Sequence, residues 1–267
     1  MADVILFGGQ SNMQGQTERR VGDTPVEGAS EYRFLSDSLV PLKNPTGEDI
    51  RFDGTEGFGF GTPGAENWHG QTALGSTVYG YTSMLPSFSD AYRNAAKNQP
   101  DVVAVHAAKG ATQIRYWLPD GEGYEMFVRK CEAAIAKTEA ELGEIGRKYM
   151  VWLQGESDAI VGVTKEDYKK MLSDLGHDLK ERFGLHRFGI IRVGCFTMDE
   201  RDWEIINAQE ELCAEDDFFV MLTRVCSDYC TKEEYKEYMN PEAHGHYSAE
   251  GLKKIGEIAG KALAESV

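Results

Sequence analysis

Short apolar runs rich in β-branched and aromatic residues recur along this chain. They lie at 4–7, 102–106, 149–153, 188–193 and 218–222, and a segment with helical spacing of apolar residues follows each, sooner or later. A run that is apolar throughout suits a strand buried on both faces, as in a parallel sheet covered by helices. The alternation therefore predicts an α/β chain with a central parallel sheet of about five strands.

Three segments predict helices most clearly. Apolar residues recur every four positions from Phe127 to Ile135, before Leu142. The pattern Thr164-x-x-Asp167 resembles a capping box at the start of a second helix. A third helix carries one apolar face formed by four residues near the end of the chain: Leu252, Ile255, Ala259 and Leu263.

Residues 16–82 interrupt the alternation with many Gly, Pro and polar residues, including the Gly-rich run 57–64. At about 150 residues per domain, 267 residues correspond to one or two domains. We expect a single domain over 1–267, in which 16–82 is a long loop excursion that ends in a helix near 83–97. A loop of this length either shapes a substrate rim or covers the sheet.

Charge and cysteine content restrict the partners and the compartment. The chain has 28 Lys and Arg against 44 Asp and Glu, a net charge of −16, which disfavours nucleic acid and anionic membranes as partners. No stretch resembles a signal peptide or a membrane span, and the odd number of cysteines, five, suits a reducing compartment. We expect a cytoplasmic protein, although a secreted chain without its leader would look the same. Cys226 and Cys230 suit a structural role better than a metal site.

The chemistry is expected where the predicted strands end, because ligands bind at the carboxyl ends of parallel strands. The segments there are 8–15, 107–114 and 154–158, and His244-Gly245-His246 precedes the last helix. Together they supply a serine, glycines, a side-chain amide and an imidazole. Acyl transfer needs this set, because an imidazole activates the serine and N–H donors stabilise the oxyanion.

The motifs Gly9-Gln10-Ser11-Asn12-Met13, Trp152 to Asp158 and His246 to Gly251 occur in that order. This arrangement resembles the SGNH hydrolase superfamily, and more narrowly the carbohydrate O-acetylesterases that include sialate O-acetylesterases and acetylxylan esterases. The resemblance implies a flavodoxin-like three-layer α/β/α sandwich, no cofactor and a serine esterase that removes O-acetyl groups from a carbohydrate through an acyl-enzyme. It also implies that Ser11 is the nucleophile, His246 the general base, and the N–H groups of Ser11, Gly110 and Gln154 the oxyanion donors.

The family usually has Asp three residues before the base, where this chain has Ala243. We expect Glu242, one residue earlier, to orient His246. Glu156 or Asp158 across the crevice, a backbone carbonyl, and a Ser–His dyad without an acid are the alternatives. If Glu242 fills the place, Glu156 and Asp158 anchor their loop as hydrogen-bond acceptors.

Gln10, Arg115 and Trp117 are the residues expected to contact the substrate. Arg115 suits a substrate carboxylate, unless it is ordinary surface charge, and Trp117 suits stacking on a sugar ring, unless it only closes the helix that follows. His244 and His246 lack a carboxylate at a known ligand spacing, so we expect no metal. Two other functions stay open: a lipase or acyl-thioesterase of the same superfamily, and a catalytically silent carbohydrate-binding relative.

Overall fold

The computed structural model describes residues 1–57, 72–75 and 82–267. In these residues one seven-stranded sheet has the order β3-β2-β4-β1-β5-β6-β7. All neighbouring strands are parallel except β2 and β3, which are antiparallel. The strands are β1 (Ala2–Gly9), β2 (Ala29–Arg33), β3 (Ser38–Pro41), β4 (Asp101–Ala108), β5 (Ile145–Leu153), β6 (Arg187–Ile191) and β7 (Phe219–Thr223).

The α/β prediction is confirmed, and the five predicted strands correspond to β1, β4, β5, β6 and β7. The strands β2 and β3 correct the picture of 16–82 as a loop. They were missed because β2 carries no continuous apolar run: its centre is the buried Glu31, which pairs with Arg33 at 2.9 Å. A short strand with a buried ion pair of this kind looks polar in the sequence.

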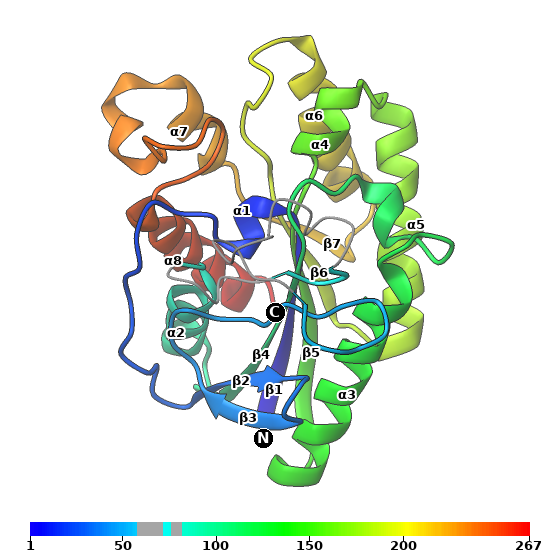
Figure 1. Cartoon of the computed structure of the whole chain (residues 1–267), viewed down its shortest axis with the longest axis vertical. Helices are drawn as coiled ribbons and strands as arrows, with labels where there is room; N and C mark the ends of the chain where they lie inside the picture. Colours follow the sequence, from blue (N-terminus) through cyan, green and yellow to red (C-terminus); the bar gives the residue numbers. More distant parts are fainter. Residues whose placement is uncertain (58–71, 76–81) are drawn as a thin grey trace.

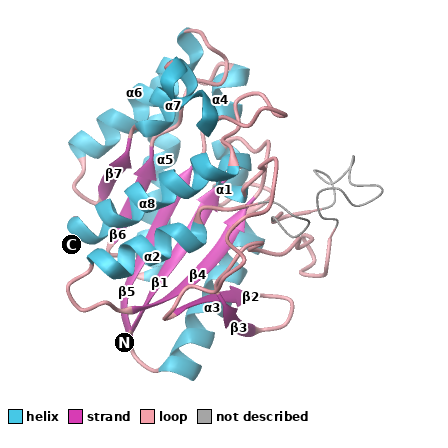
Figure 2. Cartoon of the chain, turned by 90° about the vertical axis from the view of Figure 1, so that its left-hand side faces the viewer, coloured by secondary structure: helices cyan, strands magenta, loops and turns pink. Residues whose placement is uncertain are grey.

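Helices cover both faces of the sheet (Figures 1 and 2). On one face lie α2 (Leu85–Ala95) and α8 (Ala249–Glu265), which pack together, and on the other lie α3 (Tyr124–Leu142), α5 (Lys165–Phe183) and α6 (Glu200–Glu215). This is the three-layer arrangement that the resemblance implies. Short helices complete the described elements: α1 (Ser11–Gln14), α4 (Glu156–Val161), α7 (Val225–Thr231), η2 (Ile114–Trp117) and η3 (Glu233–Tyr238).

The three predicted helices are confirmed as α3, α5 and α8, and the helix expected near 83–97 is α2. Thr164 caps α5, because its Oγ1 accepts a hydrogen bond from the backbone N–H of Asp167 at 3.2 Å. The four apolar residues of the last helix are buried against the sheet and α2.

The ends of the three central strands lie level with one another. Gly9 at the end of β1 is opposite both Ala108 of β4 and Leu153 of β5. Gly9 has φ +142°, and a Cβ there would lie 2.0 Å from the carbonyl oxygen of Leu153, so only glycine fits between these strands. The segments after the three strands therefore begin side by side at one edge of the sheet.

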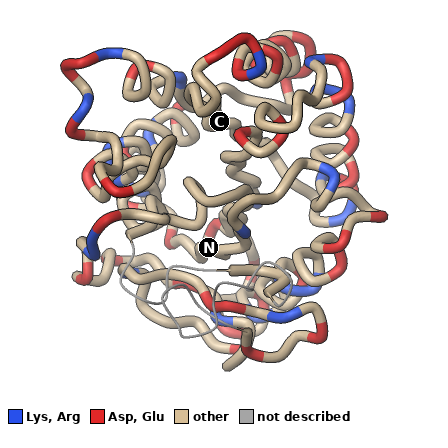
Figure 3. The backbone as a smooth tube through the Cα atoms, turned by 45° about the horizontal axis from the view of Figure 1, so that its top comes forward, with Lys and Arg blue, Asp and Glu red and all other residues tan. Residues whose placement is uncertain are grey.

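Acidic and basic residues lie mainly on the outer helices and loops (Figure 3). The net charge of −16 is thus distributed over the outside of the molecule. No helix within the described ranges is long and apolar enough to cross a membrane.

Candidate active site

The structure brings Ser11 and His246 into direct contact. Ser11 is the first residue of α1, directly after β1, and His246 lies in the loop between η3 and α8. Nε2 of His246 is 2.8 Å from Oγ of Ser11, although 235 positions separate the two residues. The hydroxyl and the imidazole therefore have the geometry that acyl transfer requires of a nucleophile and its base.

The other ring nitrogen of His246 does not meet a carboxylate. Nδ1 lies 2.8 Å from the backbone carbonyl oxygen of His244, while Glu242 is exposed. The loop turns sharply here: the N–H of His246 donates to the carbonyl of Ala243 at 3.2 Å, and Gly245 has φ +69°. This turn brings a carbonyl beneath the ring, so the contact expected from Glu242 is made by the main chain.

Phe196 packs against this loop. Its ring lies edge-on to the rings of His244 and His246, with centroids 5.4 Å and 6.1 Å away. Nε2 of His244 is 2.9 Å from the carbonyl oxygen of Phe196, so His244 anchors the loop instead of contacting Ser11. Burial lowers the pKa of His246 from its ordinary value. Its imidazole is therefore neutral and able to accept a proton at neutral pH.

The two expected oxyanion donors outside α1 already have protein acceptors. The N–H of Gly110 donates to Oε1 of Gln14 at 2.9 Å. Nε2 of the buried Gln154 donates to the carbonyl of Thr112 at 2.9 Å and to Asp158 at 2.5 Å. The expectation that Gln154 faces an oxyanion is therefore not met by this geometry, because its amide holds neighbouring segments together. In the part of the chain that the structure describes, the N–H of Ser11 has no acceptor.

Gln10 and Trp117 also differ from expectation, because both are buried. Oε1 of Gln10 accepts from the backbone N–H groups of Gly155 at 3.3 Å and Ser157 at 3.2 Å, which fixes the start of α4. The ring of Trp117 packs against Trp152 and other core aromatics, with its Nε1 bonded to Thr112, so it cannot stack on a sugar. Both residues therefore lie inside the protein, where they hold neighbouring segments in place.

Arg115 is exposed, as a substrate contact requires. It lines a cavity of about 740 Å³ together with Lys109, Gln113 and Glu122, which belong to the segment that follows β4. Burial lowers the pKa of Lys109 to about 8. The Gly-rich run 57–64 of the loop considered above as a substrate rim lies outside the described residues apart from Gly57.

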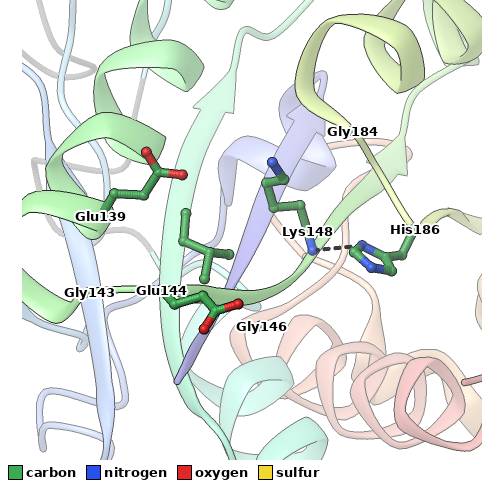
Figure 4. Close-up of a pocket in the computed structure, with 8 residues that line it drawn as sticks. Glu139, Gly143, Glu144, Gly146, Lys148, Gly184 and His186 are labelled. Atoms are coloured by element: carbon green, nitrogen blue, oxygen red, sulfur yellow. Dashed lines mark hydrogen bonds between the residues drawn. The ribbon is translucent and has the colours of Figure 1, made fainter.

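A second cavity, of about 530 Å³, lies at the opposite end of the sheet. Glu139, Lys148 and His186 line it, and Figure 4 shows these side chains around the start of β5. Ser11 follows the carboxyl end of β1, so this cavity lies away from the Ser–His pair. It plays no part in the chemistry described below.

Glu156 and Asp158 act as loop anchors, and neither touches His246. Oδ2 of Asp158 accepts from the N–H of Ile114 at 2.9 Å, and burial raises the pKa of Asp158 to about 6. Oε1 of Glu156 accepts from Nδ2 of Asn12 at 2.8 Å. Asn12 is a further site residue that the sequence pattern does not single out, since its one signal is its place directly after Ser11.

Metal ligands do not gather in the described part of the chain. No group of three or more His, Cys, Asp or Glu side chains there is placed to hold a metal ion. All five cysteines are free thiols. Cys226 and Cys230 belong to α7 and lie beside Tyr247. The donor set at Ser11 is thus one of hydroxyl, imidazole and amide groups.

A comparison with protein families agrees with this geometry. A model of the family described as "Carbohydrate esterase, sialic acid-specific acetylesterase" matches residues 1–265. Among curated protein sequences, no relative matches the chain.

Solved structures show the same fold at low sequence identity. A protein from Arabidopsis thaliana is 18% identical with a TM-score of 0.64, and the match covers 100% of both chains. NanS is 15% identical with a TM-score of 0.57, over 99% of this chain and 95% of that one. A carbohydrate acetylesterase from Xanthomonas citri is 13% identical with a TM-score of 0.52, over 99% of this chain and 57% of that one.

Proposed function

We propose, from the premise that this chain belongs to the carbohydrate esterase family of sialic acid-specific acetylesterases, that Ser11 and His246 carry out its reaction. The chain is a carboxylic ester hydrolase that removes O-acetyl groups from a carbohydrate. The observation that carries the assignment of residues is the 2.8 Å contact between Oγ of Ser11 and Nε2 of His246.

In the first half of the reaction, Nε2 of His246 takes the proton of the Ser11 hydroxyl as Oγ attacks the acetyl carbonyl carbon. The carbonyl oxygen becomes an oxyanion. When the tetrahedral intermediate collapses, the bond to the sugar oxygen breaks and Nε2 gives its proton to that oxygen. The products are a free sugar hydroxyl and acetyl-Ser11.

In the second half, His246 takes a proton from a water molecule, which attacks acetyl-Ser11. The new intermediate collapses, Oγ regains a proton from Nε2, and acetate leaves. Because burial keeps the pKa of His246 low, the imidazole starts both halves in the neutral form that accepts a proton.

The carbonyl oxygen of His244 takes the orienting role that a carboxylate has in a Ser-His-Asp triad. It accepts the hydrogen bond from Nδ1, which leaves Nε2 without a proton and aimed at Ser11. Stabilisation of the imidazolium then comes from a backbone dipole, because Glu242 is exposed. The pair operates as a Ser–His dyad.

The N–H of Ser11 is the first oxyanion donor in this proposal. The N–H of Gly110 becomes the second when the acceptor oxygen of Gln14 gives way to the substrate oxygen, which carries the greater negative charge. Gln154 supports these donors by tying Thr112 to Asp158.

The cavity beside the segment after β4 is proposed as the place of the sugar. Its lining carries Lys109 and Arg115 beside Asp120 and Glu122, and Arg115 is the exposed cation of that lining, which can pair with a carboxylate on the sugar. The family match favours a sugar over the long acyl chain of a lipase or thioesterase substrate. The contact between Ser11 and His246 disfavours a catalytically silent relative.

Ester hydrolysis by four purified proteins tests this proposal: the wild type and the variants Ser11→Ala, His246→Ala and His244→Ala. The first two variants should lose activity on p-nitrophenyl acetate by several powers of ten, because the pair acts as a unit. His244→Ala keeps the backbone carbonyl and should retain most of the rate. Activity in Ser11→Ala above a tenth of wild type would refute the assignment.

The substrate is tested with an O-acetylated sialic acid, acetylated xylan and p-nitrophenyl octanoate. We expect the acidic sugar to be preferred, with the preference reduced in Arg115→Gln. Equal rates on xylan, with no effect of Arg115→Gln, would contradict the acidic sugar while leaving the esterase chemistry intact.

A further inference from the structure

The side chain of Asn12, the residue after Ser11, has no part in the steps above and yet lies at the centre of the site. It is buried, and Nδ2 donates to Oε1 of Glu156 at 2.8 Å and to the carbonyl oxygen of Gly245 at 3.2 Å. Its Oδ1 accepts from the backbone N–H of Tyr247 at 3.3 Å. One amide therefore joins α1, the start of α4 and the loop before α8.

The two backbone groups that Asn12 binds in this loop are on either side of His246. A carbonyl is bound before the histidine, at Gly245, and an N–H after it, at Tyr247. The amide has only one suitable orientation, because a reversed amide would set its NH₂ against the N–H of Tyr247 and its oxygen against two acceptors. Asn12 thus fixes the position of the histidine backbone relative to Ser11.

The remaining main-chain bonds of His246 are local to its own loop. Its N–H donates to Ala243 at 3.2 Å, and its carbonyl accepts from Asn240 at 2.8 Å. Asn240 also donates to the carbonyl of Gln16 at 3.1 Å, which ties the start of the loop to the chain after α1. Apart from the contact between the His246 ring and Ser11, the hydrogen bonds of Asn12 are the ones that connect this loop to α1, the helix of the nucleophile.

Glu156 gives the Asn12 amide a fixed anchor. It is buried at the start of α4, whose backbone is held in place by Gln10. Oε2 has no hydrogen-bond partner among the residues that the structure describes, and burial raises the pKa of Glu156. The titratable groups facing it are Asp158 on α4, Tyr168 on α5, Asp202 on α6, Cys226 and Cys230 on α7, and Tyr247.

We propose that Asn12 and Glu156 are positioning residues, which hold His246 within hydrogen-bonding distance of Ser11 by clamping the backbone on both sides of the histidine. The proposal rests on the function assigned above to Ser11 and His246. Neither positioning residue touches the reacting atoms. Their effect is on kcat, because a displacement of about 1 Å in a catalytic group costs about 10² in rate.

The variant Asn12→Asp tests the clamp. It keeps an acceptor for Tyr247 and replaces the donor with an oxygen that faces Glu156. At pH 8 we expect kcat on p-nitrophenyl acetate to fall about 10- to 100-fold, with KM within about threefold of wild type. At pH 5.5 a proton shared by the two carboxyl groups restores a donor, so the deficit relative to wild type becomes smaller.

A second substitution restores the donor without acid. In Asn12→Asp combined with Glu156→Gln, the new amide at 156 donates to the new carboxylate at 12. We expect kcat at pH 8 to recover about tenfold relative to Asn12→Asp alone. If Asn12→Asp does not fold, Glu156→Ala, which removes the anchor and leaves the asparagine, should lower kcat about tenfold in the same assay.

Asn44→Asp is the matched control. Asn44 is buried too, and its amide bonds the backbone of Ser83 on both sides, away from the Ser–His pair. This variant should lose thermal stability and keep wild-type kcat. If Asn12→Asp behaves in the same way, with lower Tm, unchanged kcat and an unchanged pH profile, Asn12 is only structural and the clamp is refuted.

The outcomes separate this proposal from the one on which it rests. Activity in Ser11→Ala or His246→Ala removes the proposed mechanism itself. Inactive Ser11→Ala and His246→Ala, together with a wild-type kcat in folded Asn12→Asp or Glu156→Ala, remove only the clamp.

Discussion

Glu242→Gln should leave the enzyme almost unchanged, and this prediction separates a backbone-assisted dyad from a triad. Nδ1 of His246 is bonded to the carbonyl oxygen of His244 at 2.8 Å, and the Glu242 side chain is exposed. The substitution keeps the size of the side chain and removes its charge. Any effect on rate would therefore report a charge that acts on the imidazolium.

The triad and the dyad predict losses of rate in Glu242→Gln that differ by orders of magnitude. A carboxylate about 4 Å from an imidazolium, at an effective dielectric constant of about 20, stabilises it by about 4 kcal/mol, which is about 10³ in rate. Replacing the carboxylate of a Ser-His-Asp triad by its amide costs about 10⁴ in kcat. With a neutral carbonyl as the acceptor, the stabilisation of the imidazolium does not depend on residue 242, so kcat/KM of Glu242→Gln should stay within about twofold of wild type.

The assay is the initial rate of p-nitrophenyl acetate hydrolysis between pH 6 and 8. Glu250→Gln removes another exposed charge, at the start of α8 and paired with Arg19, and controls for a general change in surface potential. A loss of 100-fold or more in Glu242→Gln, with Glu250→Gln unaffected, would show that the loop rearranges and that Glu242 is the acid after all.

Three further predictions follow from the same contacts. Because burial lowers the pKa of His246, the rate should fall with acid only below about pH 6.5, as the imidazole gains its proton; a midpoint above 7 would contradict the buried, neutral base. Gly245→Ala should lower kcat at least tenfold, because a Cβ at φ +69° costs about 1–2 kcal/mol and would lie 2.1 Å from the ring of Phe196. Adding Phe196→Ala should recover part of the rate. A wild-type kcat in the single variant would refute the argument. Trp117→Ala should destabilise the fold by about 3–5 kcal/mol in urea denaturation, with KM for an acetylated sugar unchanged below the melting transition, whereas a raised KM with normal stability would restore its expected stacking role.

The sheet was predictable because buried parallel strands leave an unmistakable pattern. The runs that became β1 and β5 are apolar throughout, as is the run in β4 apart from His106, and their aligned ends place Ser11 next to the following segments without further information. The strand β2 was not predictable in this way. Its buried Glu31 is compensated by Arg33, a tertiary contact that the local sequence does not reveal.

The Ser–His pair was predictable, and its surroundings were less so. A backbone carbonyl has no sequence signature, so the search for an acid settled on Glu242, although a turn at Gly245 brings the carbonyl of His244 to the ring. Trp117 was ambiguous because an aromatic residue two positions after Arg115, in a polar segment, looks the same in the sequence whether its ring points inward or outward. The burial of Gln154 depends on Asp158 and Thr112, which become its partners only in the folded chain.

The most direct test of the account is the site of acetylation during turnover. Wild-type protein is mixed with excess p-nitrophenyl acetate, quenched in acid within the first turnover, digested with trypsin and sequenced by tandem mass spectrometry. The peptide 1–19, which ends at the first basic residue, contains Ser11 and Thr17 as its hydroxyl residues. We predict one acetyl group on Ser11, accumulating before steady state and absent from His246→Ala; an unmodified Ser11 beside an acetyl group on another residue, in an active enzyme, would contradict the central claim.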